Sequence, residues 1–275
     1  MEGCGENLHE SAVTGCLKTT TLLGFSITSN YGEKYICFVF SFFERKIKEY
    51  HKKTGKAMRD FKNTGIGLRW NNFFRVYFIL PRLRRGIKNA NFSLLANNCN
   101  GGFIYHDLGL QFRSPTINMY FIHDHFLRFL EDFDYYISQE LVKCKYPTFT
   151  EPNNSPICNL GSGDKKIELH FLHYHSFSEC CELWEKRKKR LNKNNLFIVM
   201  AAFDKAEEEC VKRFDNLPFK NKVIFIERPM PAYKSAYYIK GYEHTGLGVL
   251  SRFSGFCGKR IFDQFDFVKW FNTNG

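Results

Sequence analysis

Long apolar runs are missing from this 275-residue chain, and their absence argues against a membrane-spanning protein. The longest run, at residues 35–43, is nine residues long, about half of the ~20 that a transmembrane helix needs. The first residues, MEGCGENLHE, lack the basic segment of a secretory signal peptide. We therefore expect a cytoplasmic protein without a transmembrane segment.

Regularly spaced cysteine pairs are missing as well. Ten cysteines are present, but none form a CxxC pair, and a chain of this length does not need disulfides to stabilise its core. Zinc ligands could come from the pair Cys180–Cys181 and from five histidines, yet no spacing matches a CxxC or HExxH template. The histidines are His123, His125, His170, His173 and His175. We expect reduced thiols and no metal site.

Acidic side chains are scarce in one segment. Residues 44–88 hold 14 Lys or Arg and three Asp or Glu, whereas the rest of the chain is nearly balanced, at 26 against 25. A solvated helix face with a linker would explain this segment. The alternative is a basic surface that faces an anionic membrane or another polyanion, because two apolar runs, 35–43 and 73–80, adjoin it. No nucleic-acid-binding motif accompanies it, so nucleic acid is not an expected partner.

Beyond residue 86, short apolar runs alternate with longer helical patterns. This alternation predicts an α/β fold with a mostly parallel sheet and flanking helices, in three layers. Helical patterns lie at 124–143, from Ser176 to about Leu191, up to about Asn216, and at 264–271. The strand candidates are residues 92–96, 166–172, 196–202, 222–226 and 235–239.

Composition divides the chain into two parts. Residues 1–85 predict a basic extension that is poorly ordered at first and partly helical later, and Pro81 and Gly86 mark its end. Residues 86–275 predict the α/β domain. Thirty phenylalanines indicate that large rings fill its core.

Cys99 is the most informative residue at the end of a predicted strand. In open parallel sheets, ligands bind at the carboxyl ends of the strands. Cys99 follows the strand at 92–96 within the turn Asn97-Asn98-Cys99-Asn100-Gly101-Gly102. A helix N-terminus would lower the pKa of its thiol, and the amides of Gly101 and Gly102 could form an oxyanion hole. The alternative is a small buried thiol in a tight turn.

Histidine and arginine candidates follow other predicted strands. His173 and His175 share one face of the strand pattern, opposite His170, so either could act as a base toward Cys99. A histidine packed at a strand edge is the alternative for each. Arg228 follows the strand at 222–226 and could bind a phosphate or carboxylate, although a surface role explains it equally well.

The segment NNCNGGFIYHDLGL at residues 97–110 resembles an uncharacterised bacterial family that is often assigned to exopolysaccharide biosynthesis. The family usually has an aromatic residue after the cysteine, where this chain has Asn100. The strand–Asn–Cys turn also resembles that of WcbI-like capsule-biosynthesis proteins, which are regarded as acyltransferases that use coenzyme A. Further matching segments lie, in order, at residues 114–118, 168–174, 184–200, 214–225 and 263–272.

These resemblances imply an acyltransferase that acts on a glycan or a glycan precursor. Cys99 would be the nucleophile, His173 or His175 the base, and a coenzyme A thioester the donor. Asn97, Asn98, Gly101, Gly102 and Arg228 would bind substrate. The alternative is a non-catalytic module that binds a glycan or a partner within a polysaccharide assembly complex, held near a membrane by residues 35–88, which include the basic residues 44–88. A glycosyltransferase or phosphotransferase would need a metal-binding carboxylate pair, and we find no convincing one.

Overall fold

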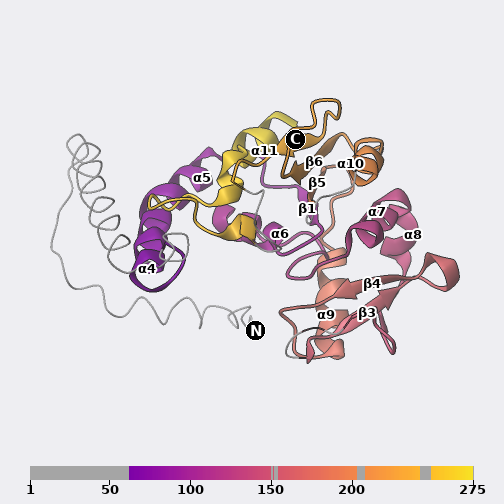
Figure 1. Cartoon of the computed structure of the whole chain (residues 1–275). Coiled ribbons are helices and arrows are strands. Elements are labelled where there is room, and N and C mark those ends of the chain that lie inside the picture. Colours follow the sequence, from indigo (N-terminus) through magenta and orange to yellow (C-terminus); the bar gives the residue numbers. More distant parts are fainter. Residues whose placement is uncertain (1–61, 150, 152–153, 203–207, 242–248, 275) are drawn as a thin grey trace, which may run out of the picture. The chain divides into compact units, whose positions relative to one another are not determined.

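The computed structural model describes residues 62–149, 151, 154–202, 208–241 and 249–274 (Figure 1). Every described residue belongs to one compact unit, Arg59–Gly275. The prediction of a poorly ordered and then partly helical extension concerns residues 1–85, and residues 1–61 of it lie outside the described residues. The same holds for the part of the basic segment at 44–61.

Four parallel strands form the central sheet in the order β1-β5-β6-β7. The apolar runs that predict buried strands form them, because each can bury both of its faces against helices. The sheet confirms the predicted α/β fold. Its strands are β1 (Ser93–Ala96), β5 (Leu196–Ala201), β6 (Asn221–Ile226) and β7 (Ala236–Tyr238).

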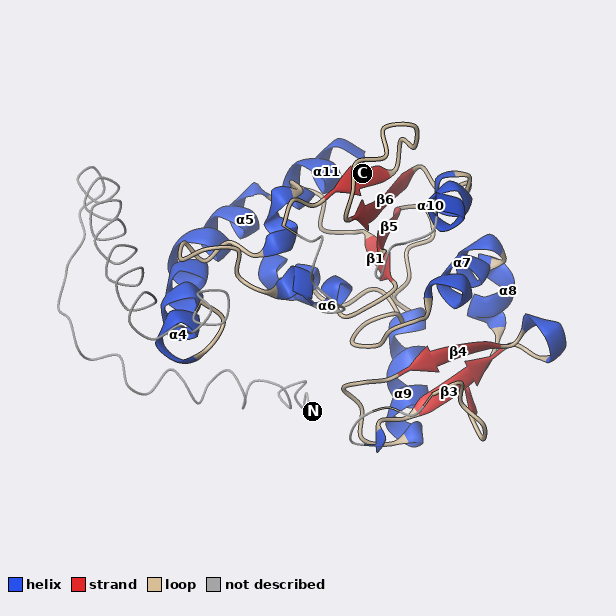
Figure 2. Ribbon diagram, viewed as in Figure 1, coloured by secondary structure: helices blue, strands red, loops and turns tan. Residues whose placement is uncertain are grey.

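Helices cover both faces of this sheet (Figure 2). Alternate residues of each strand point to opposite faces, so every strand contributes to two separate cores. Helices α6 (Asn100–Leu108) and α11 (Phe267–Asn274) pack on the face that carries Leu94. Helix α10 (Glu208–Asp215) packs on the face that carries Leu95. The result is the predicted arrangement of three layers.

Aromatic rings fill the core beside α11. The ring of Phe92 stacks on Phe271, with centroids 4.0 Å apart, and both rings meet Phe197 edge-on. All three side chains are fully buried. Edge-to-face and offset contacts of this kind add to the free energy gained from burial. The abundance of phenylalanine therefore predicts the composition of this core correctly.

The predicted strand at 166–172 exists, but it lies outside the parallel sheet. It is β4 (Ile167–His170), which pairs antiparallel with β3 (Ile157–Leu160) in a second sheet, and β3 pairs with β2 (Val142–Lys143). Alternation of apolar residues marks a strand but not its partner. The predicted place of this strand in the parallel sheet is wrong for that reason.

The predicted helix at 124–143 is interrupted. It consists of α7 (His123–Glu131) and α8 (Phe133–Ser138), and Asp132 between them has non-helical torsions of φ −126° and ψ 49°. The helix predicted from Ser176 to about Leu191 is α9 (Phe177–Lys188), whose first turn is capped by the Ser176 hydroxyl. Short 3₁₀ turns are η3 (Gly163–Lys165), η4 (Val249–Ser251) and η5 (Ile261–Gln264).

A continuous helical segment precedes β1. It consists of α4 (Gly65–Phe74), a π-helical turn η1 (Arg75–Ile79) and α5 (Leu80–Gly86). Arg75 is 2% exposed and is bonded to residues of the α/β unit. The predicted domain boundary at residue 86 therefore falls inside the compact unit that begins at Arg59.

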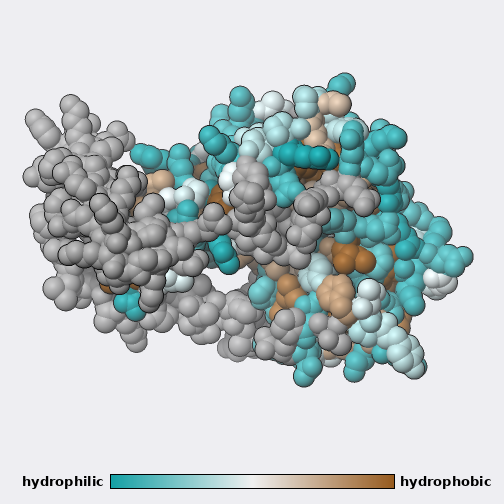
Figure 3. Space-filling model, viewed as in Figure 1, coloured by the Kyte–Doolittle hydropathy of each residue, from teal (hydrophilic) through white to brown (hydrophobic). Residues whose placement is uncertain are grey.

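Hydrophilic residues cover most of the described surface that faces the viewer in Figure 3. Hydrophobic residues, drawn in brown, reach this surface mainly in the region around α7 and β4, which Figure 1 labels in the same view. Among the described residues, no helix is both long and apolar enough to cross a membrane.

Candidate functional site

The turn between β1 and α6 places Cys99 where the sequence predicts it, at the carboxyl end of a parallel strand. Cys99 is the N-cap residue of α6 and is partly exposed. The side chain of Asn98 turns toward the helix, and its Oδ1 accepts a hydrogen bond of 2.9 Å from the backbone N–H of Asn100. This bond satisfies one of the N–H groups that the start of a helix leaves without a partner.

The predicted lowering of the Cys99 pKa is wrong. Burial raises the pKa of the thiol to about 11, because removal from water penalises the thiolate more than the backbone of the turn stabilises it. Among the described residues, no imidazole contributes to the shift of this pKa. Cys99 is therefore a protonated thiol at neutral pH.

Asn97 joins the carboxyl ends of β1 and β5. Its Nδ2 donates to the carbonyl oxygen of Ala201 at 3.0 Å, and its Oδ1 accepts from the N–H of Ala201 at 2.9 Å. The side chain thus continues the strand pairing beyond Ala96, and it is fully buried. The structure gives Asn97 a structural role, and its predicted role in substrate binding stays a prediction.

Close packing explains the two glycines of the turn. A Cβ on Gly101 would lie 2.8 Å from the Cβ of Ala96, and one on Gly102 would lie 2.5 Å from Oδ1 of Asn118. The N–H of Gly101 already donates to the carbonyl oxygen of Asn98 at 3.4 Å. These glycines let α6 approach β1 and the following loop, and their predicted role as oxyanion donors stays a prediction.

Cys99 lies between two asparagines, Asn98 and Asn100, whose side-chain amide nitrogens have no hydrogen-bond partner among the described residues. Asn98 is 6% exposed and Asn100 is 2% exposed, and within the described part of the chain the Nδ2 atom of each makes no hydrogen bond. A buried donor without a partner is costly, so such groups commonly mark a place where a ligand or water completes the bond. The sequence analysis identified Asn98 but missed Asn100, which it treated as a departure from the family pattern.

His173 and His175 do not lie on a strand. Both are exposed in the connection between β4 and α9, because β4 ends at His170. The backbone N–H of His175 donates to Glu179 Oε2 at 2.7 Å, which helps to start α9. The predicted shared strand face of these two histidines is therefore wrong, and their predicted role as a base stays a prediction.

His170 instead forms a buried polar cluster. Its Nδ1 lies 2.8 Å from Oε1 of Glu151, and its Nε2 lies 3.7 Å from Oε2 of Glu168. The hydroxyl of Tyr120 donates to the same Glu151 oxygen at 2.8 Å. The rings of Tyr120 and Phe149 each stack on the imidazole, with centroids 4.6 Å away. Burial lowers the pKa of His170, although both carboxylates oppose this shift.

Backbone bonds connect this cluster to the Cys99 turn. Phe121 N–H donates to the carbonyl oxygen of Asn97 at 2.9 Å, and Tyr120 and His170 exchange two backbone hydrogen bonds of 2.9 and 3.0 Å. The segment around Tyr120 therefore bridges the end of β1 and the end of β4. The sequence contains no signal for this link, because the three segments are far apart along the chain.

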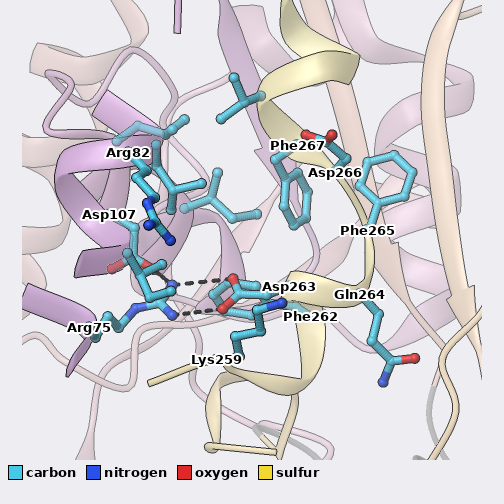
Figure 4. A pocket seen from close by; sticks show the side chains of 15 residues that line it. Arg75, Arg82, Asp107, Lys259, Phe262, Asp263, Gln264, Phe265, Asp266 and Phe267 are labelled. Atoms are coloured by element: carbon cyan, nitrogen blue, oxygen red, sulfur yellow. Dashed lines mark hydrogen bonds and ion pairs between the residues drawn. The ribbon is translucent and has the colours of Figure 1, made fainter. Parts of the chain in front are cut away.

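A cavity of about 360 Å³ lies beside Arg75 (Figure 4). The Arg75 guanidinium bonds to Asp107 of α6 at 2.5 Å and to Asp263 of η5 at 2.7 Å. Burial opposes the charge of Arg75, but the two carboxylates raise its pKa above the ordinary value. A π-helical turn frequently accompanies a functional site, and here it places Arg75 against both carboxylates. Because its charge is neutralised by them, we assign this group to stability.

Arg228 lies exposed in the turn after β6. This position is at the carboxyl end of a strand of the central sheet, as the sequence predicts, but two strands away from β1. Its predicted role in binding a phosphate stays a prediction. Among the described residues, no group of three or more His, Cys, Asp or Glu side chains could hold a metal ion.

Comparison with known proteins identifies the family of this chain. Residues 70–272 match the model of a domain of unknown function, DUF1919. The chain belongs to the DUF1919 family. An uncharacterized protein of Haemophilus influenzae is 44% identical over 198 residues, which are 71% of this chain and 91% of that protein.

The DUF1919 match includes every candidate residue described above. It begins within α4, ahead of Arg75 and well ahead of residue 86. The family region thus agrees with the compact unit of the structure, in which the helical segment before β1 is bonded to α6.

Proposed function

We propose that this protein is an acyltransferase of exopolysaccharide or capsule biosynthesis that uses Cys99 as its nucleophile. The observation that carries the proposal is a partly exposed thiol at the start of α6, flanked by two buried asparagines whose amide nitrogens have no partner among the described residues. Such donors can stabilise the negative charge that develops on a carbonyl oxygen during acyl transfer.

The first chemical step is an exchange between a thiol and a thioester. The Cys99 sulfur attacks the carbonyl carbon of a coenzyme A thioester, the bond to the coenzyme sulfur breaks, and the Cys99 proton passes to the leaving sulfur. A glycan hydroxyl then attacks the Cys99 thioester, and its proton returns to the thiol. Neither step changes the net charge, and together they need only the coenzyme A thioester and the glycan hydroxyl.

Burial of Cys99 favours such an intermediate in one respect. The same desolvation that raises the thiol pKa to about 11 penalises a thiolate, but a thioester is neutral and avoids this penalty. A partly buried position also keeps water from the thioester. In this proposal His173 or His175 assists proton transfer, and Arg228 binds a phosphate of the donor.

The glycan acceptor rests on resemblance. The segment around Cys99 is similar to proteins assigned to exopolysaccharide and capsule biosynthesis, and similarity in a motif suggests a reaction without proving it. The acceptor in this proposal is therefore a glycan or its nucleotide-linked or lipid-linked precursor.

The experiment is intact-protein mass spectrometry after incubation with acetyl coenzyme A. We expect one added acetyl group, which hydroxylamine removes at neutral pH, and we expect no addition to Cys99→Ala. Cys257→Ala is the matched control, because Cys257 is also a partly exposed free thiol, and it should acetylate like the parent protein. Equal acetylation of the parent protein and Cys99→Ala would exclude the thiol mechanism.

A second candidate is a non-catalytic module that binds a glycan or a partner. The raised pKa of Cys99 favours it, because a protonated, partly buried thiol is a poor nucleophile. This candidate predicts that Asn98→Ala weakens binding of a capsular oligosaccharide, whereas Cys99→Ala leaves binding unchanged and no acyl-protein forms. Calorimetric titration of the full chain measures the first result, and the mass spectra above measure the second.

A further inference from the structure

The helical segment Gly65–Gly86 has an unusual distribution of side chains. It buries two polar side chains, Asn71 and Arg75, next to the buried Phe74 and Leu80, while several of its large apolar side chains are exposed. Asn71 is fully buried and bonds to the backbone of Gly255 and Gly258, and Arg75 is buried against Asp107. A surface helix of a globular protein normally turns its large apolar side chains toward the core. The inward bonds fix the orientation of the segment, and so they fix which side chains face outward.

The outward side chains are large and apolar. Ile66 is 68% exposed, Tyr77 54% and Val76 49%, and Phe73 and Leu68 are also exposed. Of the nine exposed large hydrophobic residues among the described residues, five lie within residues 66–77. Single exposed apolar residues are ordinary, but a concentration of them marks an interaction surface.

Positive charge surrounds these side chains. From Lys62 to Asn91 the sequence contains no Asp or Glu. Of its basic residues, only Arg75 is buried. The others are at least partly exposed, and they are Lys62, Arg69, Arg82, Arg84, Arg85 and Lys88. Three of these side chains meet the rest of the protein: Lys62 Nζ donates to the carbonyl oxygen of Ser254, Arg84 donates to those of Asp107 and His106, and Arg82 lines the cavity beside Arg75. We call the exposed apolar side chains of residues 66–77, together with Arg69, Arg85 and Lys88, the docking face.

We propose that the docking face binds the surface of an anionic lipid bilayer. Lipid headgroups provide the complementary negative charge, and the boundary below them accepts the apolar side chains. Tyr77 has the amphipathic ring that suits this boundary. Arginine and lysine side chains can extend their apolar stems along the boundary while their charges stay with the headgroups. The inference is independent of the reaction proposed above.

The test measures binding of the full chain to sedimenting lipid vesicles. One set is phosphatidylcholine alone, and the other contains about a third phosphatidylglycerol. We expect binding to the anionic vesicles only, and weaker binding as salt rises, because salt screens exposed charges. The double variant with Ile66→Ser and Tyr77→Ser should have a partition coefficient about tenfold lower than the parent protein. Arg69→Glu with Lys88→Glu should weaken it at least fivefold for each charge.

Matched controls come from β2 and the loop that follows it. Val142 and Tyr146 are 58% and 90% exposed, so Val142→Ser with Tyr146→Ser removes similar apolar area elsewhere. Lys143→Glu with Lys145→Glu reverses two exposed charges there. Both controls should bind like the parent protein. Ile66→Leu with Tyr77→Trp keeps the apolar face and should retain binding, which separates loss of contact from loss of folding.

Three outcomes would overturn the proposal. The first is no binding of the parent protein to anionic vesicles. The second is binding that the docking-face variants and the controls reduce equally. The third is a parent protein that is dimeric in light scattering and becomes monomeric in Ile66→Ser with Tyr77→Ser, while vesicle binding does not change. That result would assign the face to a second copy of the chain.

Discussion

Nη2 of Arg75 lies 2.5 Å from Oδ2 of Asp107, and both side chains are almost completely buried. Arg75 belongs to the π-helical turn η1, and Asp107 belongs to the last turn of α6. Asp263 of η5 bonds to the same guanidinium at 2.7 Å. The three elements are therefore connected by charge, and the connection holds the helical segment before β1 to the rest of the fold.

Removal of the Asp107 charge should destabilise the protein strongly. Asp107→Asn leaves the Arg75 charge buried with one carboxylate fewer, and loss of one partner of a buried ion pair costs about 3–5 kcal/mol. Urea unfolding followed by circular dichroism measures this cost. Asp134→Asn is the control, because the Asp134 side chain is 83% exposed and its bridge to Lys193 contributes about 1 kcal/mol at most. Equal effects of the two substitutions would contradict the prediction.

Acid should weaken the same contact. Burial alone would raise the pKa of Asp107, but hydrogen bonds from His106 and Arg75 and the charge of Arg260 lower it below its ordinary value. A carboxylate whose pKa is lower in the folded state stabilises the fold above its unfolded pKa of about 4, and this stabilisation is lost as pH falls through the folded value. The difference in unfolding free energy between the parent protein and Asp107→Asn should therefore shrink below about pH 4. A difference that stays constant into strong acid would show that ionisation of Asp107 has no part in it.

Gly102→Ala should destabilise the Cys99 turn, because its Cβ would lie 2.5 Å from Oδ1 of Asn118. Overpacking of this kind costs about 1–3 kcal/mol. Gly255→Ala is the control, since nothing lies within 4 Å of its added Cβ and its φ is not in the left-handed region. Asn118 has a φ of 59°, which glycine adopts readily. Asn118→Gly should therefore restore stability to Gly102→Ala, and thermal unfolding of the single and double variants tests this.

Alkylation of Cys99 should accelerate with pH. Burial raises its pKa to about 11, and only the thiolate reacts with iodoacetamide. The rate should rise about tenfold for each pH unit between pH 7 and pH 10. Peptide mass spectrometry measures labelling at this residue alone, and Cys99→Ala confirms the assignment of the peptide. A rate that reaches its plateau below pH 8 would mean that a neighbouring group activates the thiol.

The strands of the central sheet could be predicted from the sequence because their signal is local. Buried parallel strands are short apolar runs between helical patterns, and the runs that contain β1, β5 and β6 have this form. The Cys99 turn was predictable for the same reason, because an apolar strand, a polar turn and two glycines follow one another along the chain. The pairing of β4 was not predictable, because alternation does not identify a partner strand.

The sequence by itself determined the fold class, the position of Cys99 at a strand end, and the concentration of basic and apolar residues ahead of β1. Each of these depends on neighbours along the chain. Tertiary structure alone decided the protonated state of Cys99, the burial of His170 between Tyr120 and Phe149, and the pairing of Arg75 with Asp263 across 188 residues. Desolvation, ring stacking and ion pairing depend on distance in space, and that distance exists only after the chain has folded.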